Sequence, residues 1–121
     1  MGLDMYAFAI PDTPATPVDF EVETGGELHY WRKHPNLHGW MEALYRTKGG
    51  RDADFNCVNL QLTADDLERL EADIRSGSLP PTSGFFFGQS DGTEVADDLA
   101  FVEKARAEIA DGMTVFYTSW W

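Results

Sequence analysis

Two aromatic rings and two cations occupy four consecutive positions, Tyr30 to Lys33. Successive side chains of a strand point to opposite faces, so Trp31 and Lys33 would share one face and their two neighbours the other. A ring beside a cation can stack on a planar group and pair with a carboxylate or phosphate, with arginine acting as a fork of donors and lysine as a point charge. The pattern predicts a site for a small anionic or planar ligand, such as a nucleotide.

A helix beginning at Pro35 would bring two further side chains to this site. Proline suits the first helical position, and apolar residues follow at spacings of three and four until Gly49. The free amides of the first turn favour an anion by about 0.3 to 1 kcal/mol. We expect six residues to hold the ligand: Tyr30, Trp31, Arg32, Lys33, His38 and Trp40. The alternative is that the rings fill the core while the two cations pair with surface acids.

Cys57 is the single cysteine, so the chain forms no intrachain disulfide. Covalent catalysis by a thiolate and the imidazole of His38 would require the two side chains to lie within hydrogen-bond reach. A lone cysteine in a predicted strand is more often a small core residue, and we expect Cys57 to be buried. An enzyme that depends on a cysteine or a metal is therefore the third hypothesis, and whether the protein is an enzyme stays open.

Histidines 34 and 38 and Glu42 are spaced by four residues, which on a helix would align zinc ligands. Pro35 at the first helical position leaves His34 outside the regular turn. We therefore expect no metal site, and the sequence indicates no cofactor.

The chain is strongly acidic, with 21 Asp and Glu against nine Lys and Arg and a net charge of −12. Such a charge repels nucleic acid and anionic membrane, so direct binding to either is not expected. Residues 29–51 nevertheless hold five of the nine basic residues and one acidic residue, which leaves room for a local anion site. The acidity also supports an alternative function, an interaction protein that mimics nucleic acid and blocks a basic host protein.

The 121 residues, of which 43% are hydrophobic, suit one globular domain spanning 1–121. No apolar run approaches the roughly 20 residues that span a bilayer, and the N-terminus lacks the pattern of a signal peptide, so we expect a cytoplasmic protein. The pattern of apolar residues and breakers predicts an α+β fold, with three helices on a mostly antiparallel sheet of four or five strands. A parallel α/β sheet is the alternative, because the later strands alternate with helices.

Several elements are predicted in detail. Strands are expected at 3–10, 55–62 and 113–121, and an edge hairpin is expected to pair 18–23 with 27–33. Thr63 with Asp66 should form a variant of the capping box at the start of the second helix. The third helix should bury Val95, Leu99, Val102 and Ile109, and residues 84–88 should form a short apolar strand or loop. The two terminal tryptophans face opposite ways, so one is available to dock on a second copy in a homodimer.

Five blocks of the chain resemble a group of small uncharacterised proteins encoded by bacteriophages and bacteria. The blocks are Gly2-Leu3-Asp4-Met5-Tyr6, Tyr30-Trp31-Arg32-Lys33 with Leu37-His38 and Trp40, Asn56-Cys57, Leu79-Pro80 with Gly84 to Gly88, and Tyr117 with Ser119-Trp120. Some members of the group carry the label phosphoglycerate kinase, but this chain is too short for that two-domain enzyme and has no glycine-rich phosphate loop. The resemblance implies an accessory protein of a phage or prophage and supplies no mechanism.

Overall fold

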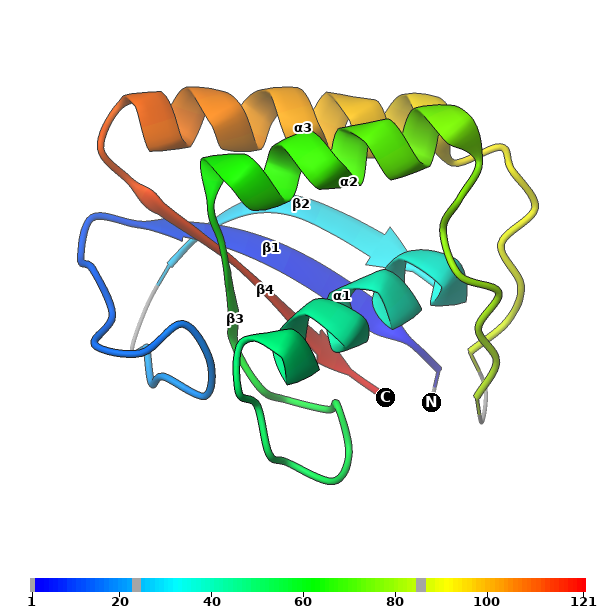
Figure 1. The fold of residues 1–121 in the computed structure, drawn as a ribbon, viewed down its shortest axis with the longest axis horizontal. Helices are drawn as coiled ribbons and strands as arrows, with labels where there is room; N and C mark the ends of the chain where they lie inside the picture. The colour runs from blue at the N-terminus through cyan, green and yellow to red at the C-terminus, as the bar shows by residue number, and fades with distance from the viewer. Residues whose placement is uncertain (1, 23–24, 85–86) are drawn as a thin grey trace.

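The computed structural model describes residues 2–22, 25–84 and 87–121. Within these ranges the elements follow in the order β1 (Asp4–Ile10), β2 (Gly26–Arg32), α1 (Pro35–Thr47), β3 (Leu60–Leu62), α2 (Ala64–Ser76), α3 (Val95–Ala110) and β4 (Thr114–Trp120). The strands form one sheet in the order β2-β1-β4-β3, with every pair antiparallel (Figure 1). The predicted α+β domain with three helices is confirmed, and the parallel alternative is wrong.

All three helices pack on one face of the sheet. His38 of α1 contacts Tyr117 of β4, and Phe101 of α3 meets the Trp31 ring of β2 edge-on, with ring centroids 4.8 Å apart. Figure 1 shows α2 and α3 running side by side, and Arg106 pairs with Glu71 across them. Among the residues that the structure describes, no helix covers the second face of the sheet.

Strand alternation assigns the side chains to two faces, which we call the covered face and the open face. The covered face carries Met5, Ala7, Ala9, His29, Trp31, Leu60, Leu62, Val115, Tyr117 and Ser119, all of them buried. The open face carries Asp4, Tyr6, Phe8, Tyr30, Arg32, Phe116, Thr118 and Trp120. Phe20 covers Phe116 on the open face. The two rings meet edge to face, with their centroids 5.4 Å apart.

The sequence correctly predicts the start of α2. The Thr63 hydroxyl accepts the Asp66 amide at 3.2 Å, and the Asp66 carboxylate accepts the Thr63 amide at 2.8 Å. Gly77 then ends the helix in the left-handed region, at a φ of 70°. The capping box and the glycine stop are both confirmed.

The predicted hairpin of 18–23 with 27–33 is wrong, because β2 pairs with β1 and not with residues 18–22, the part of that segment within the described ranges. Val18 instead forms a bridge with Leu60, at the outer edge of β3. The amide of Asp19 donates to the carbonyl of Asn59, and the amide of Gln61 donates to the carbonyl of Pro17, both at 2.9 Å. The segment is therefore held by the free hydrogen-bonding groups of β3, a contact between distant parts of the chain.

Two other predictions need correction. The strand expected at 55–62 is reduced to β3, because Cys57 adopts a φ of 59° that no continuous strand can contain. In α3, Val102 is buried as expected, but Val95 is 41% exposed. The buried face of this helix consists of Asp98, Phe101, Val102 and Ala105.

Residues 84–88 fall only partly within the described ranges, because Phe85 and Phe86 lie outside them. Phe87 is buried and packs edge-on against His38 and Trp121. No helix in the described parts of the chain is long and apolar enough to cross a membrane.

Candidate functional site

The six residues expected to hold a ligand are divided between the two faces of the sheet. Trp31 lies on the covered face, 4% exposed, where its indole donates to Asp98 Oδ1 at 3.0 Å. Its ring also contacts His29 and Phe101, at centroid distances of 4.5 and 4.8 Å. Trp31 therefore builds the core between β2 and α3, as the alternative interpretation of the sequence proposed for the rings.

His38 is also a core residue. Its Nδ1 lies 2.7 Å from the Tyr117 hydroxyl, and the ring makes a second hydrogen bond to the Phe55 carbonyl. Burial lowers the pKa of His38 from 6.5 to about 4. The imidazole is neutral at pH 7, so it offers no charge to an anion.

Trp40 and Lys33 point in other directions. The half-buried Trp40 indole donates to Asp73 Oδ2 at 2.8 Å and so ties α1 to α2. Lys33 follows the last residue of β2 with a φ of 55°, and its amide donates to the Leu3 carbonyl. This left-handed backbone breaks the alternation that would have placed the exposed Lys33 on the same face as Trp31.

Tyr30 and Arg32 remain together on the open face, as the alternation predicts. The Tyr30 hydroxyl donates to Asp4 Oδ1 at 2.7 Å, and Arg32 Nε lies 3.6 Å from the same oxygen. Tyr30 is 44% exposed. Asp4 is thus the shared partner of the exposed ring and the cation.

A continuous row of rings extends from Tyr30 across the open face. Ring centroids lie 5.3 Å apart between Tyr30 and Tyr6, 6.0 Å between Tyr6 and Phe8, and 5.4 Å between Phe8 and Phe116. Trp120 is 67% exposed and sits opposite Asp4 in the register of β1 and β4. We call Tyr6, Phe8, Tyr30 and Trp120 the open-face rings.

The predicted ligand site omits three of the open-face rings, Tyr6, Phe8 and Trp120, although the sequence carries a signal for them. Tyr6 and Phe8 occupy alternate positions in one strand, and Phe116 and Trp120 share a face in another. Alternation identifies which rings share a face, but not which face the helices leave open.

Two carboxylates, those of Asp4 and Glu27, lie near this row of rings. The pKa of Tyr6 is raised, first by burial and then by the charges of Asp4 and Glu27. The pKa of Tyr30 is raised chiefly by its hydrogen bond to Asp4. Both phenols therefore stay protonated well above neutral pH. Arg32 of β2 adds a positive charge to the open face.

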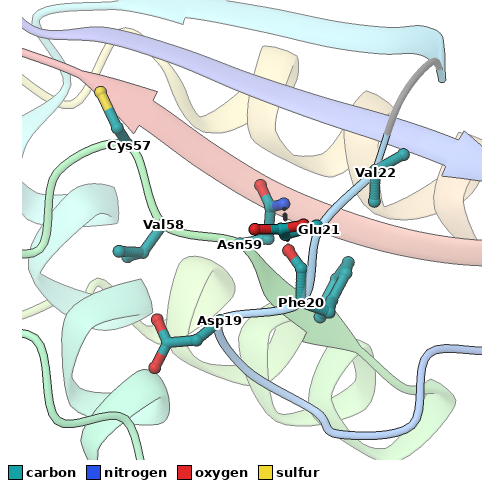
Figure 2. Close-up of a pocket in the computed structure, with 7 residues that line it drawn as sticks. All are labelled: Asp19, Phe20, Glu21, Val22, Cys57, Val58 and Asn59. Atoms are coloured by element: carbon teal, nitrogen blue, oxygen red, sulfur yellow. Dashed lines mark hydrogen bonds between the residues drawn. The ribbon is translucent and has the colours of Figure 1, made fainter.

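A cavity lies beside the sheet, where the 18–22 segment meets the residues that precede β3 (Figure 2). It is an open cavity of about 740 Å³ lined by Asp19, Phe20, Glu21, Val22, Cys57, Val58 and Asn59. Figure 2 shows Cys57 at one end of the cavity, with its sulfur directed away from the carboxylates of Asp19 and Glu21.

Cys57 is exposed, so our expectation of a buried core thiol is wrong. Its Sγ lies 3.5 Å from Asn56 Oδ1, and its amide donates to the Ser119 carbonyl. His38 has both ring nitrogens bonded to other core groups, so the structure does not bring the thiol and the imidazole together as a catalytic pair. Among residues 2–22, 25–84 and 87–121, no group of three His, Cys, Asp or Glu side chains gathers around a metal-sized space.

Comparison of the chain with protein-family models, curated proteins and solved structures gives no match. The resemblance to the phage and bacterial group therefore stays a prediction.

Proposed function

We propose that the protein is a binding module that holds a planar ligand on the open face of its sheet. The observation that carries this proposal is the row of contacting rings from Phe8 through Tyr6 to the exposed Tyr30, together with the exposed Trp120 on β4, on the other side of β1. Aromatic faces bind planar groups by stacking, worth about 1 to 3 kcal/mol per ring for a nucleobase. A contiguous exposed apolar patch on a soluble protein is typical of a binding surface.

Arg32 gives this surface a way to recognise an anionic substituent. Asp4 of β1 lies between Arg32 of β2 and Trp120 of β4. The backbones of Arg32 and Trp120 are therefore about 10 Å apart, twice the spacing between strands. A ring stacked on Trp120 or Tyr30 would place a phosphate or carboxylate within reach of the guanidinium, which binds such groups through paired donors. A mononucleotide has both parts, whereas the net charge of −12 disfavours a long nucleic acid.

The acidic groups around the rings favour a second candidate, a basic segment of a partner protein. Asp4 and Glu27 both act on Tyr6 through their charges, which would attract a cation to the same surface. Lys and Arg side chains also bind over aromatic rings, with about 0.5 to 2 kcal/mol per contact. The basic host protein expected from the composition would be such a partner. Either candidate function would suit an accessory protein of a phage or prophage.

Titration of the protein with nucleotides and with an arginine-rich peptide tests the proposal, with tryptophan fluorescence and calorimetry as readouts. Tyr30→Ala and Trp120→Ala should each weaken binding by about tenfold or more, the loss expected for one stacking contact. Val95→Ala is the matched control, because Val95 is an exposed apolar residue on α3 and should leave binding unchanged. Binding that survives both open-face substitutions would overturn the proposal.

Arg32→Ala separates the two candidates. Loss of the guanidinium should weaken a nucleotide but strengthen or leave unchanged a cationic peptide, because one positive charge is removed from an acidic surface. Peptide binding should also fall steeply with added salt.

A further inference from the structure

A serine, a histidine and an aspartate form a hydrogen-bonded chain on the helical side of the sheet, away from the open face. Ser90 Oγ lies 2.6 Å from His34 Nδ1, and His34 Nε2 lies 2.8 Å from Asp98 Oδ2. His34 precedes α1, Asp98 lies in the first turn of α3, and Ser90 comes from the segment before α3. Three separate parts of the chain thus meet at one imidazole.

The partners of Asp98 fix the proton on the imidazole. Asp98 is 1% exposed, and its two oxygens face the Trp31 indole N–H and His34 Nε2. A carboxylate only accepts hydrogen bonds, so the neutral imidazole must carry its proton on Nε2. The lone pair of Nδ1 then faces Ser90, whose hydroxyl donates to it. This is the arrangement of nucleophile, base and orienting carboxylate found in serine-dependent acyl transfer, with the two ring nitrogens exchanged.

Two further groups stabilise the charges that would form when Ser90 loses its proton. The amide of Asn36, in the first turn of α1, donates to Ser90 Oγ at 3.1 Å and would stabilise negative charge on the oxygen. Glu94 Oε2 lies 3.5 Å from His34 Nδ1 and would stabilise the imidazolium. Ser90 itself is half-buried, whereas the imidazole is 3% exposed, so solvent meets this chain of groups at the Ser90 end, where His34 Nδ1 also lies.

We propose that Ser90 is an activated nucleophile that accepts acyl groups from small carboxylic esters, with His34 as its general base and Asp98 as the positioning residue. Ser90 Oγ bonds to the ester carbonyl carbon and gives its proton to His34 Nδ1. The bond from that carbon to the alcohol oxygen then breaks, and the leaving alcohol takes the proton from His34. Water adds to the acyl-serine through the same base, the acyl–Oγ bond breaks, and the acid and the free Ser90 hydroxyl are restored.

The test uses a fluorophosphonate probe on the intact folded protein, with intact-mass and peptide mass spectrometry. A fluorophosphonate loses fluoride when an activated serine attacks its phosphorus, so one adduct per chain should form and map to Ser90. Ser90→Ala should remove the adduct from a protein that circular dichroism shows to be folded, although its melting temperature falls because His34 and the Asn36 amide lose a hydrogen-bond partner. Ser83→Ala, which alters an exposed serine nearby in the chain, should leave the adduct unchanged. Failure of the native protein to form an adduct at Ser90 would overturn the proposal.

The roles of His34 and Asp98 have their own readouts. The rate of adduct formation should rise with pH through one ionisation, because only the neutral imidazole accepts the Ser90 proton. Asp98→Asn should slow the reaction by about 100-fold, and Asp98→Glu should restore part of the rate. A labelling rate at Ser90 that does not change with pH as an imidazole titrates would refute the assignment of His34 as the base. This measurement uses the native protein, so it does not depend on the stability of the Asp98 variants.

Discussion

The covered and open faces of the sheet both carry several aromatic rings, but they differ in how the polar atoms of those rings are satisfied. On the covered face, the Trp31 indole is bound to Asp98 and the Tyr117 hydroxyl to His38, each partner also being buried. On the open face, Tyr30 bonds to the partly exposed Asp4, Tyr6 contacts the rings of Tyr30 and Phe8, and Trp120 is 67% exposed. Internal partners close the first face to ligands, whereas the second presents ring surface to solvent. Aromatic content alone does not distinguish a core from a binding surface.

Neighbouring residues of β2 provide the sharpest test of this difference. Trp31→Ala should lower the free energy of unfolding by about 3 to 5 kcal/mol, because it empties a packed site and leaves Asp98 without its indole donor. Tyr30→Ala, one residue earlier on the opposite face, should cost about 1 kcal/mol or less. Urea unfolding of the two variants measures both effects, and equal losses would contradict the assignment of the faces.

The buried imidazole of His38 should make stability depend on pH. Its folded pKa is about 4 against 6.5 for the exposed group, so the unfolded state binds more protons between these values. The stabilisation that the neutral His38 contributes should therefore be complete above pH 6.5. The free energy of unfolding should fall by roughly 3 kcal/mol as the pH drops toward 4. NMR titration of the His38 ring in the folded protein checks the assignment, and a midpoint near 6.5 would refute it.

Removal of one hydroxyl from each face gives a smaller and closely matched comparison. Tyr117→Phe deletes the partner of His38 Nδ1 inside the core and should cost about 1 to 3 kcal/mol. Tyr30→Phe deletes an exposed hydroxyl and should change stability by about 0.5 kcal/mol or less. If thermal unfolding showed the larger loss for Tyr30→Phe, the buried hydrogen bond would not stabilise the covered face as described.

The smallest stability effect is expected at Cys57. Because this side chain is exposed, Cys57→Ser should change the free energy of unfolding by about 0.5 kcal/mol or less. Iodoacetamide should alkylate the native protein at a rate close to that of the denatured protein. Protection of the thiol until denaturant is added would show that Cys57 is buried, against the structure.

Local sequence patterns predicted those parts of the fold that depend on neighbouring residues. Thr63 and Asp66 are three residues apart, and the capping box that they form needs no distant partner. Asp98 is different, because an aspartate in a helix is expected to face solvent. It is buried because His34 and Trp31, more than sixty residues earlier, donate hydrogen bonds to it.

The candidate site also combines a local pattern, which the sequence shows, with a property of the whole fold, which it does not. Alternation correctly separated Tyr30 and Arg32 from Trp31. The covering of one face by helices is a property of the whole fold, so the sequence did not reveal that Tyr6 and Trp120 join them. The sequence also carries no sign that the backbone of Lys33 is left-handed. Lysine rarely adopts this conformation, so its presence does not predict it.

The contact between Val18 and the outer edge of β3 has a consequence for how copies of the chain meet one another. A sheet edge with free amides and carbonyls recruits strands from other chains and promotes aggregation. Here the β3 edge is occupied by the segment that begins at Pro17. The register of β2 shifts opposite the step from Ala7 to Phe8, and this edge carries the charge of Glu27. Both edges are thereby protected against strand addition, so the protein can leave rings exposed on one face without inviting fibre growth along its edges.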